Sequence, residues 1–110
     1  MKSLLATSLT LVALWVNTSL ASPENIKIQA LDDAQVFANI SDELPAVMNY
    51  FSKQSEQDII EFYQSHYGEV IKSSRKRDRL TSYFQFNDLT VRVVISQQNN
   101  ARQVDVIVTK

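Results

Sequence analysis

The residues of this chain best suited to chemistry form a basic run, KSSRKRDR, between Lys72 and Arg79. Lysine and arginine bind phosphate, sulfate and carboxylate groups through charge-assisted hydrogen bonds. The run is therefore a candidate anion-binding site. Because residues 1–21 predict export, as argued below, the expected ligands are lipid phosphates, acidic glycans or an acidic protein. The alternative is a solvated turn that protects a sheet edge from aggregation. The candidate binding residues are Lys72, Arg75, Lys76, Arg77 and Arg79.

The charge of the chain is unevenly distributed. Residues 22–71 carry a net charge of −7, whereas residues 72–110 carry +5. Such asymmetry steers association with charged partners and does not determine the fold. It favours a ligand or a protein partner that is itself acidic. The expected localisation outside the cytoplasm argues against nucleic acid as the ligand.

The remaining polar residues do not form a catalytic pattern. His66 is the only histidine, and a general base or a metal site needs further groups at fixed spacing. Three acidic residues lie near a helix start, where their charges interact favourably with the positive end of the helix dipole: Glu56, Asp58 and Glu61. They do not resemble the convergent carboxylate pair of a glycosidase. The chain has no cysteine and one glycine, Gly68, which excludes thiol chemistry and Gly-rich phosphate loops. We therefore assign no catalytic residue, metal or cofactor and expect a non-enzymatic protein.

A helix is predicted over residues 56–67. Ser55 is a good N-cap, and Gly68 stands where a left-handed C-cap glycine belongs. Apolar side chains recur at helical spacing along one side, which predicts burial against a sheet. This stripe consists of Ile59, Ile60, Phe62, Tyr63, His66 and Tyr67.

Four strands are predicted after the helix, at residues 69–75, 79–86, 89–97 and 102–109. Two-residue turns at Asn87-Asp88 and Asn99-Asn100 suit type I′ hairpins. Both turns then place the same apolar set on one face, which fixes the register. The expected pairs are Phe86 with Leu89, Phe84 with Val91, Ser82 with Val93, Leu80 with Ile95, Ile95 with Val104, Val93 with Val106 and Val91 with Val108.

Two more strands, 35–40 and 46–52, are predicted to form a hairpin before the helix. The place of strand 46–52 in the sheet is open, and a right-handed crossover would set it parallel to strand 69–75. Residues 22–34 are expected to be a loosely ordered start, with a short strand considered at 26–30.

Residues 1–21 are typical of a cleavable signal peptide. Lys2 precedes an apolar run from Leu4 to Val16, and Ser19-Leu20-Ala21 offers small residues for cleavage before Ser22. The run is shorter than the roughly 20 apolar residues of a membrane-spanning helix. No cysteine lies near the cut, so we expect a periplasmic or secreted protein that is not a lipoprotein and has no transmembrane segment after cleavage.

The stretch SEQDIIEFYQSHYG, from Ser55 to Gly68, follows a strand and precedes a β-meander. In this it resembles small uncharacterised bacterial secreted proteins with a helix of the form Ser-x-x-x-Ile-Ile-x-Phe-Tyr. The resemblance covers about residues 46–109. It implies an α+β fold and bacterial export, and it carries over no catalytic residue.

These inferences predict a signal peptide at 1–21, an N-terminal segment at 22–34 and one α+β domain at 35–110. The domain has two layers, with an antiparallel sheet of about five strands and one helix packed on one face. We expect a binding or accessory domain that recognises an anionic ligand or acidic partner through its basic hairpin. The alternative is an inhibitor or immunity-like protein that acts by protein–protein contact.

Overall fold

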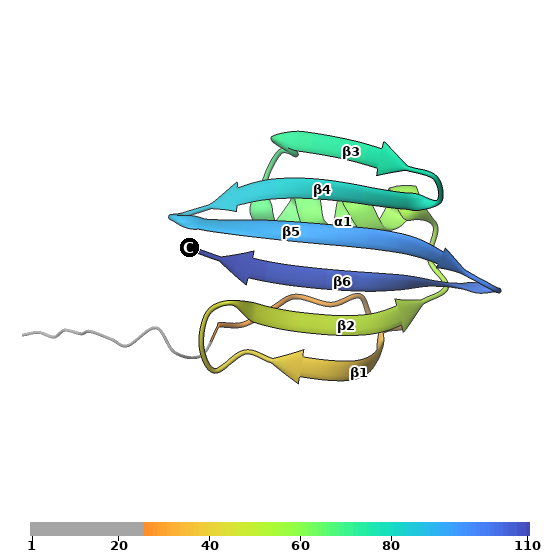
Figure 1. The fold of residues 1–110 in the computed structure, drawn as a ribbon, viewed down its shortest axis with the longest axis horizontal. Coiled ribbons are helices and arrows are strands. Elements are labelled where there is room, and N and C mark those ends of the chain that lie inside the picture. Colours follow the sequence, from red (N-terminus) through yellow and green to blue (C-terminus); the bar gives the residue numbers. More distant parts are fainter. Residues whose placement is uncertain (1–25) are drawn as a thin grey trace, which may run out of the picture.

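Residues 26–110 form an antiparallel sheet with one helix across one of its faces (Figure 1). The computed structural model describes residues 26–110, so the expected signal peptide lies outside the described part. The sheet has six strands, one more than the sequence estimate of about five. The elements are β1 (Gln35–Ile40), β2 (Ala46–Ser52), α1 (Glu56–Tyr67), β3 (Lys72–Lys76), β4 (Arg79–Phe86), β5 (Leu89–Gln98) and β6 (Ala101–Thr109).

The strands lie in the order β1-β2-β6-β5-β4-β3. β2 pairs antiparallel with β6, so the parallel placement of residues 46–52 beside the strand after the helix is wrong. From β2 the chain passes through α1 behind the sheet and reaches β3 at the opposite edge (Figure 1). The pairing with β6 is favourable because it aligns two apolar rows on the helix face, in which Tyr50 lies opposite Val104 and Met48 opposite Val106.

The predicted register of the meander is confirmed. Phe84 pairs with Val91 and Val93 pairs with Val106, and the other pairs expected from the two turns are present as well. The turn type is wrong, because only the first residue of each turn has a positive φ, 59° at Asn87 and 25° at Asn99, whereas type I′ needs two. β3 begins at Lys72 rather than at residue 69.

The helix ends behave largely as predicted. The Ser55 hydroxyl accepts a hydrogen bond from the Asp58 N–H at 3.0 Å. Gly68 ends the helix with φ 96° and ψ −162°, outside the left-handed helical region and in a conformation essentially restricted to glycine. After this turn, the Ile71 N–H donates to the Tyr83 carbonyl at 2.9 Å, which brings the chain alongside β4 just before β3 starts.

The core lies between α1 and the inner face of the sheet. Ile59 and Tyr63 are fully buried, and Ile60, Phe62 and Tyr67 are half-buried. The fully or nearly buried apolar residues of the sheet are Ala46, Met48, Tyr50, Phe84, Val91, Val93, Ile95, Val104, Val106 and Val108. The predicted apolar stripe therefore packs on the sheet, except for His66, which is exposed in the last turn of the helix.

Residues 26–34 contain no helix or strand, so the short strand considered there is absent. They pack beside α1 on the helix side of the sheet, with Ile28 buried. Two tyrosines of the helix hold the segment in place. The Tyr63 hydroxyl donates to the Gln29 carbonyl at 2.8 Å, and the Gln29 N–H donates to the Tyr67 hydroxyl at 3.4 Å.

Candidate functional site

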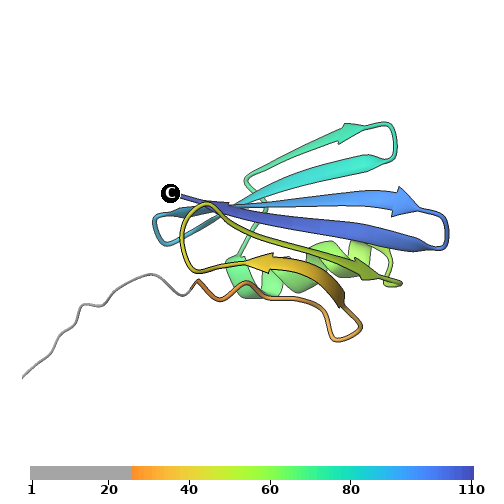
Figure 2. The ribbon, with the colours of Figure 1, turned by 60° about the horizontal axis from the view of Figure 1, so that its bottom comes forward.

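The candidate site is the face of the sheet opposite α1. Neither the helix nor residues 26–34 cover this face, so within the described chain it is open to solvent (Figure 2). Residues directly opposite each other on paired strands share a face. The register therefore defines rows of side chains that run across all six strands. One such row consists of Lys72, Tyr83, Arg92, Ile107, Val47 and Ile40.

Cations gather on the β3–β4–β5 half of this face. Lys76 lies directly opposite Arg79 across the β3–β4 hairpin. Two rows further along the same face, beyond the row of Ser74, Thr81 and Val94, Tyr83 stands between Lys72 and Arg92. The Lys72 Nζ lies 5.4 Å from the centre of the Tyr83 ring, which allows a cation–π interaction.

The candidate residues of the basic run do not all converge. Arg75 points to the helix face, where it forms a salt bridge with Glu56 at the start of α1. Arg77 occupies the β3–β4 turn with φ 60°. Lys72, Lys76 and Arg79 share the uncovered face, and among residues 26–110 none of these three forms a salt bridge. Their positive charges are therefore not neutralised within the described chain.

Arg92 joins these cations although it lies outside the basic run. It faces Tyr83 on one side and Ile107 on the other. The two-turn register already places Arg92 on the outer face. The signal was therefore present in the sequence, but the contiguous run of charge drew the assignment to the hairpin alone.

Asp105 is the one acidic side chain that the register places on the uncovered rows within the described chain. Its carboxylate accepts hydrogen bonds from the Asn49 amide at 2.6 Å and from the Gln103 amide at 2.9 Å. Two neutral amides therefore hold it, and it forms no salt bridge with Arg79 or Arg92.

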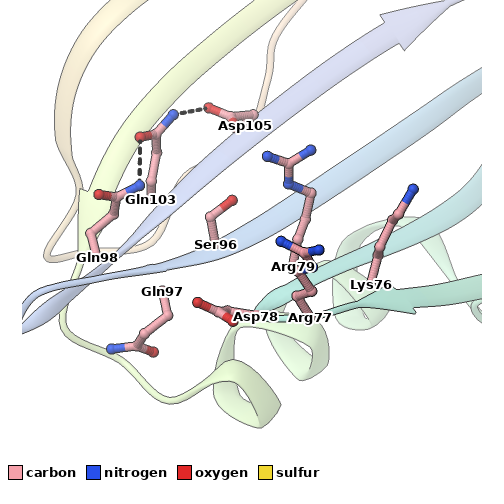
Figure 3. Close-up of a pocket in the computed structure, with 9 residues that line it drawn as sticks. All are labelled: Lys76, Arg77, Asp78, Arg79, Ser96, Gln97, Gln98, Gln103 and Asp105. Atoms are coloured by element: carbon pink, nitrogen blue, oxygen red, sulfur yellow. Dashed lines mark hydrogen bonds between the residues drawn. The ribbon is translucent and has the colours of Figure 1, made fainter.

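Two shallow, open hollows mark the uncovered face. One, of about 570 Å³, lies between the β3–β4 turn and the end of the β5–β6 hairpin (Figure 3). In Figure 3, hydrogen bonds link Gln98, Gln103 and Asp105 along one wall. The second, of about 390 Å³, lies over the middle of the sheet, and its lining includes Arg79, Tyr83, Arg92 and Ile107. Asp105 also lines the second hollow, so an anion there would be within reach of two arginines and would face a carboxylate that two amides already hold.

The β6–β2–β1 half of the face is more apolar. Ile107, Val47 and Ile40 continue the row that starts with Lys72, and Ile40 is 58% exposed. Near the other end of these strands, Phe37 and Phe51 stack with ring centres 4.9 Å apart. The free side of an antiparallel sheet is usually polar, so this half departs from the ordinary pattern.

The other polar groups considered from the sequence lie apart from this face. His66 packs its ring beside Phe62 on the helix, 4.6 Å between centres. Within residues 26–110 no three His, Cys, Asp or Glu side chains lie close enough together to hold a metal ion. None of the helices described is long and apolar enough to cross a membrane.

Comparison with protein-family models, with curated proteins and with solved structures finds no match to this chain.

Proposed function

We propose that this protein is a non-enzymatic binding domain that recognises an anionic ligand on the uncovered face of its sheet. The register supports this proposal, because it places Lys72, Lys76, Arg79 and Arg92 on one solvent-exposed face without a salt bridge among the described residues. The proposal narrows the site from the whole basic hairpin to one of its sides. Arg75 is left out because Glu56 already neutralises it.

The energetics of the cations favour an external anion. Like charges directly opposite each other on neighbouring strands destabilise a sheet, and Lys76 and Arg79 stand in that relation. A surface that served only for solubility would be better stabilised by an acidic partner on one of the two strands. A bound phosphate, sulfate or carboxylate relieves this repulsion and gains charge-assisted hydrogen bonds.

We further propose that the domain acts after export from a bacterial cell. The sequence pattern of residues 1–21 supports this location. In the exported protein, mass spectrometry is expected to find a chain that begins at Ser22. A mass that retains residues 1–21 would contradict this part of the proposal.

The binding proposal is tested by neutralising the face. In one variant Lys72, Lys76, Arg79 and Arg92 are all changed to Gln, and in a matched control Lys27, Lys53, Arg75 and Lys110 are changed to Gln. Both variants lose the same charge, but only the first loses it from the uncovered face. All of these residues are exposed, so both variants are expected to fold, which circular dichroism checks.

The two variants are compared on a heparin column eluted with NaCl, and by NMR titration with inorganic pyrophosphate. The face variant is expected to elute at clearly lower salt than the control and to lose its pyrophosphate shifts. Equal elution of the two variants would show that net charge alone governs retention, and pyrophosphate shifts confined to other surfaces would place the site elsewhere. Either result overturns the proposal.

A second candidate function is inhibition by contact with another protein. The free edge of β1 favours it, because this strand carries no charge and exposes Val36, Phe37 and Ile40. An exposed edge strand can pair with a strand of a partner. For this function, Phe37→Lys is expected to abolish capture of the partner protein. The variant with Lys72, Lys76, Arg79 and Arg92 changed to Gln is expected to capture the partner normally.

A further inference from the structure

We infer that the anionic ligand is an amphiphile, with its charged head group on the cationic half of the uncovered face and its apolar chain across the other half. This inference rests on the binding function proposed above and names the class of ligand. It follows from the change of side-chain chemistry along one row of this face, from charged and polar on β3–β5 to aliphatic on β6, β2 and β1.

The row from Lys72 to Ile40 shows this division most clearly. Its members on β3, β4 and β5 are Lys72, Tyr83 and Arg92, and its members on β6, β2 and β1 are Ile107, Val47 and Ile40. A change of chemistry at the middle of the row therefore separates three polar or charged positions from three aliphatic ones.

The dimensions suit a lipid-like molecule. Neighbouring strands lie about 4.8 Å apart, so the distance from Arg92 to Ile40 is roughly 14 Å. This is close to the hydrocarbon depth of one membrane leaflet, which is about half of 30 Å. An extended acyl chain that starts at Arg92 would thus reach the β1 edge of the sheet.

The central hollow lies where head group and chain would join. Arg79 and Arg92 line it together with Ile107, the first aliphatic residue of the row, and with Asp105, whose carboxylate is held by the amides of Asn49 and Gln103. Neither arginine is engaged in a salt bridge within the described chain. An anion bound by both arginines would therefore place an attached chain at Ile107, with Val47 and Ile40 beyond it.

An acidic protein would neutralise only the cations and would leave Ile40, which is exposed, and Val47 and Ile107, which are half-buried, in contact with water. Contiguous exposed apolar surface beside a charged patch is typical of an interaction site for a partner that is itself amphipathic. Charge complementarity with the four cations and contact with the aliphatic row together favour a single anionic lipid-like molecule.

The test uses alkyl phosphates with chains of 8, 10 and 12 carbons, as monomers, in isothermal titration calorimetry. Full burial of a methylene improves affinity about fourfold, and an open face buries about half of it. Each addition of two carbons is therefore expected to tighten binding by about fourfold. Circular dichroism in the tyrosine region confirms that the protein remains folded during the titration.

Two variants separate the head-group site from the chain site. The variant with Ile40, Val47 and Ile107 changed to Thr keeps β-branched residues and is expected to lose the dependence on chain length while its affinity for inorganic phosphate is unchanged. A control, Ile71→Thr, alters an aliphatic residue that is 60% exposed outside the sheet rows and is expected to bind like the parent protein.

The possible results distinguish this inference from the function on which it rests. Phosphate binding without any dependence on chain length overturns the inference and leaves the anion site standing. If none of the anions tested binds, both the inference and the proposed binding function are overturned. Equal binding of dodecyl maltoside, which has the same chain and no charge, overturns the inference by showing an unspecific apolar surface. Binding to anionic phospholipid vesicles but not to monomeric alkyl phosphates overturns it in favour of a membrane surface.

Discussion

The hydrogen bonds of two buried tyrosines predict an unequal effect of removing either hydroxyl group. The Tyr50 and Tyr63 oxygens lie 2.6 Å apart, and the Tyr63 hydroxyl donates to the Gln29 carbonyl. A hydroxyl has one proton, so Tyr50 must donate to Tyr63. Tyr63→Phe therefore leaves both the Tyr50 proton and the Gln29 carbonyl without a partner. Tyr50→Phe leaves the bond from Tyr63 to Gln29 in place and removes one donor, together with a backbone contact from Leu31.

The magnitudes follow from the burial of both side chains, which are 0% exposed. A buried polar group left unsatisfied costs about 1–3 kcal/mol, and a simple lost hydrogen bond about 1 kcal/mol. We expect Tyr63→Phe to lower the free energy of unfolding by about 2–4 kcal/mol and Tyr50→Phe by about 1 kcal/mol. The double variant is expected to be no less stable than Tyr63→Phe alone, because it no longer contains the orphaned Tyr50 proton.

Urea unfolding followed by circular dichroism measures these differences, with equal m-values required for the comparison. Tyr83→Phe on the uncovered face is the control, and its effect should stay within about 0.5 kcal/mol. The reasoning is refuted if Tyr50→Phe costs as much as Tyr63→Phe, or if the two effects simply add in the double variant. Hydrogen exchange should also show faster opening of residues 26–34 in Tyr63→Phe.

Three shorter predictions concern the backbone and pH. Gly68→Ala is expected to lower the free energy of unfolding by about 1–3 kcal/mol from backbone strain alone, because nothing lies within 4 Å of the added Cβ; a neutral result in urea unfolding would contradict the assigned φ of 96°. Arg77→Asn is expected to raise the melting temperature slightly, since asparagine tolerates a positive φ better than arginine does, and a fall would contradict this. Burial raises the pKa of Tyr50 from 10.0 to about 12, so the stability that this tyrosine contributes is fully present below pH 10 and is lost as the pH rises towards 12. Urea unfolding at each pH measures this loss, and a free energy of unfolding that stays constant from pH 10 to 12 would contradict the prediction.

Most of the fold follows from patterns that are local in the sequence. β1, β2, α1 and β4 have the predicted bounds, because turn residues and caps flank each of them. The register of the meander was predictable because two independent turns had to agree on one buried face. In these segments the hydrophobic period and the turn chemistry point to the same structure.

The features that sequence reasoning missed depend on distant contacts. The pairing of β2 with β6 joins residues fifty or more positions apart, as in Asn49 with Asp105. The docking of residues 26–34 depends on tyrosine hydroxyls of the helix, which period and propensity do not reveal.

The candidate site was predictable only in part, for a similar reason. The basic run is visible in the sequence, but the pleat of β3 sends Arg75 to one face and Lys72 and Lys76 to the other. Arg92 joins the same face from a different strand and is invisible to any search for contiguous charge. The site is therefore a property of the sheet register rather than of a motif.

The strand order has a consequence for the order in which the sheet assembles. β2, an early strand, has its long pairing partner in β6, the last strand in chain order. The β1–β2 hairpin therefore cannot join the rest of the sheet until β6 is available for pairing, since the loop between the two strands must close before their contacts form. A polypeptide with this strand order therefore stays without its β2–β6 pairing while its earlier strands are already present, and the two halves of the sheet join only through β6.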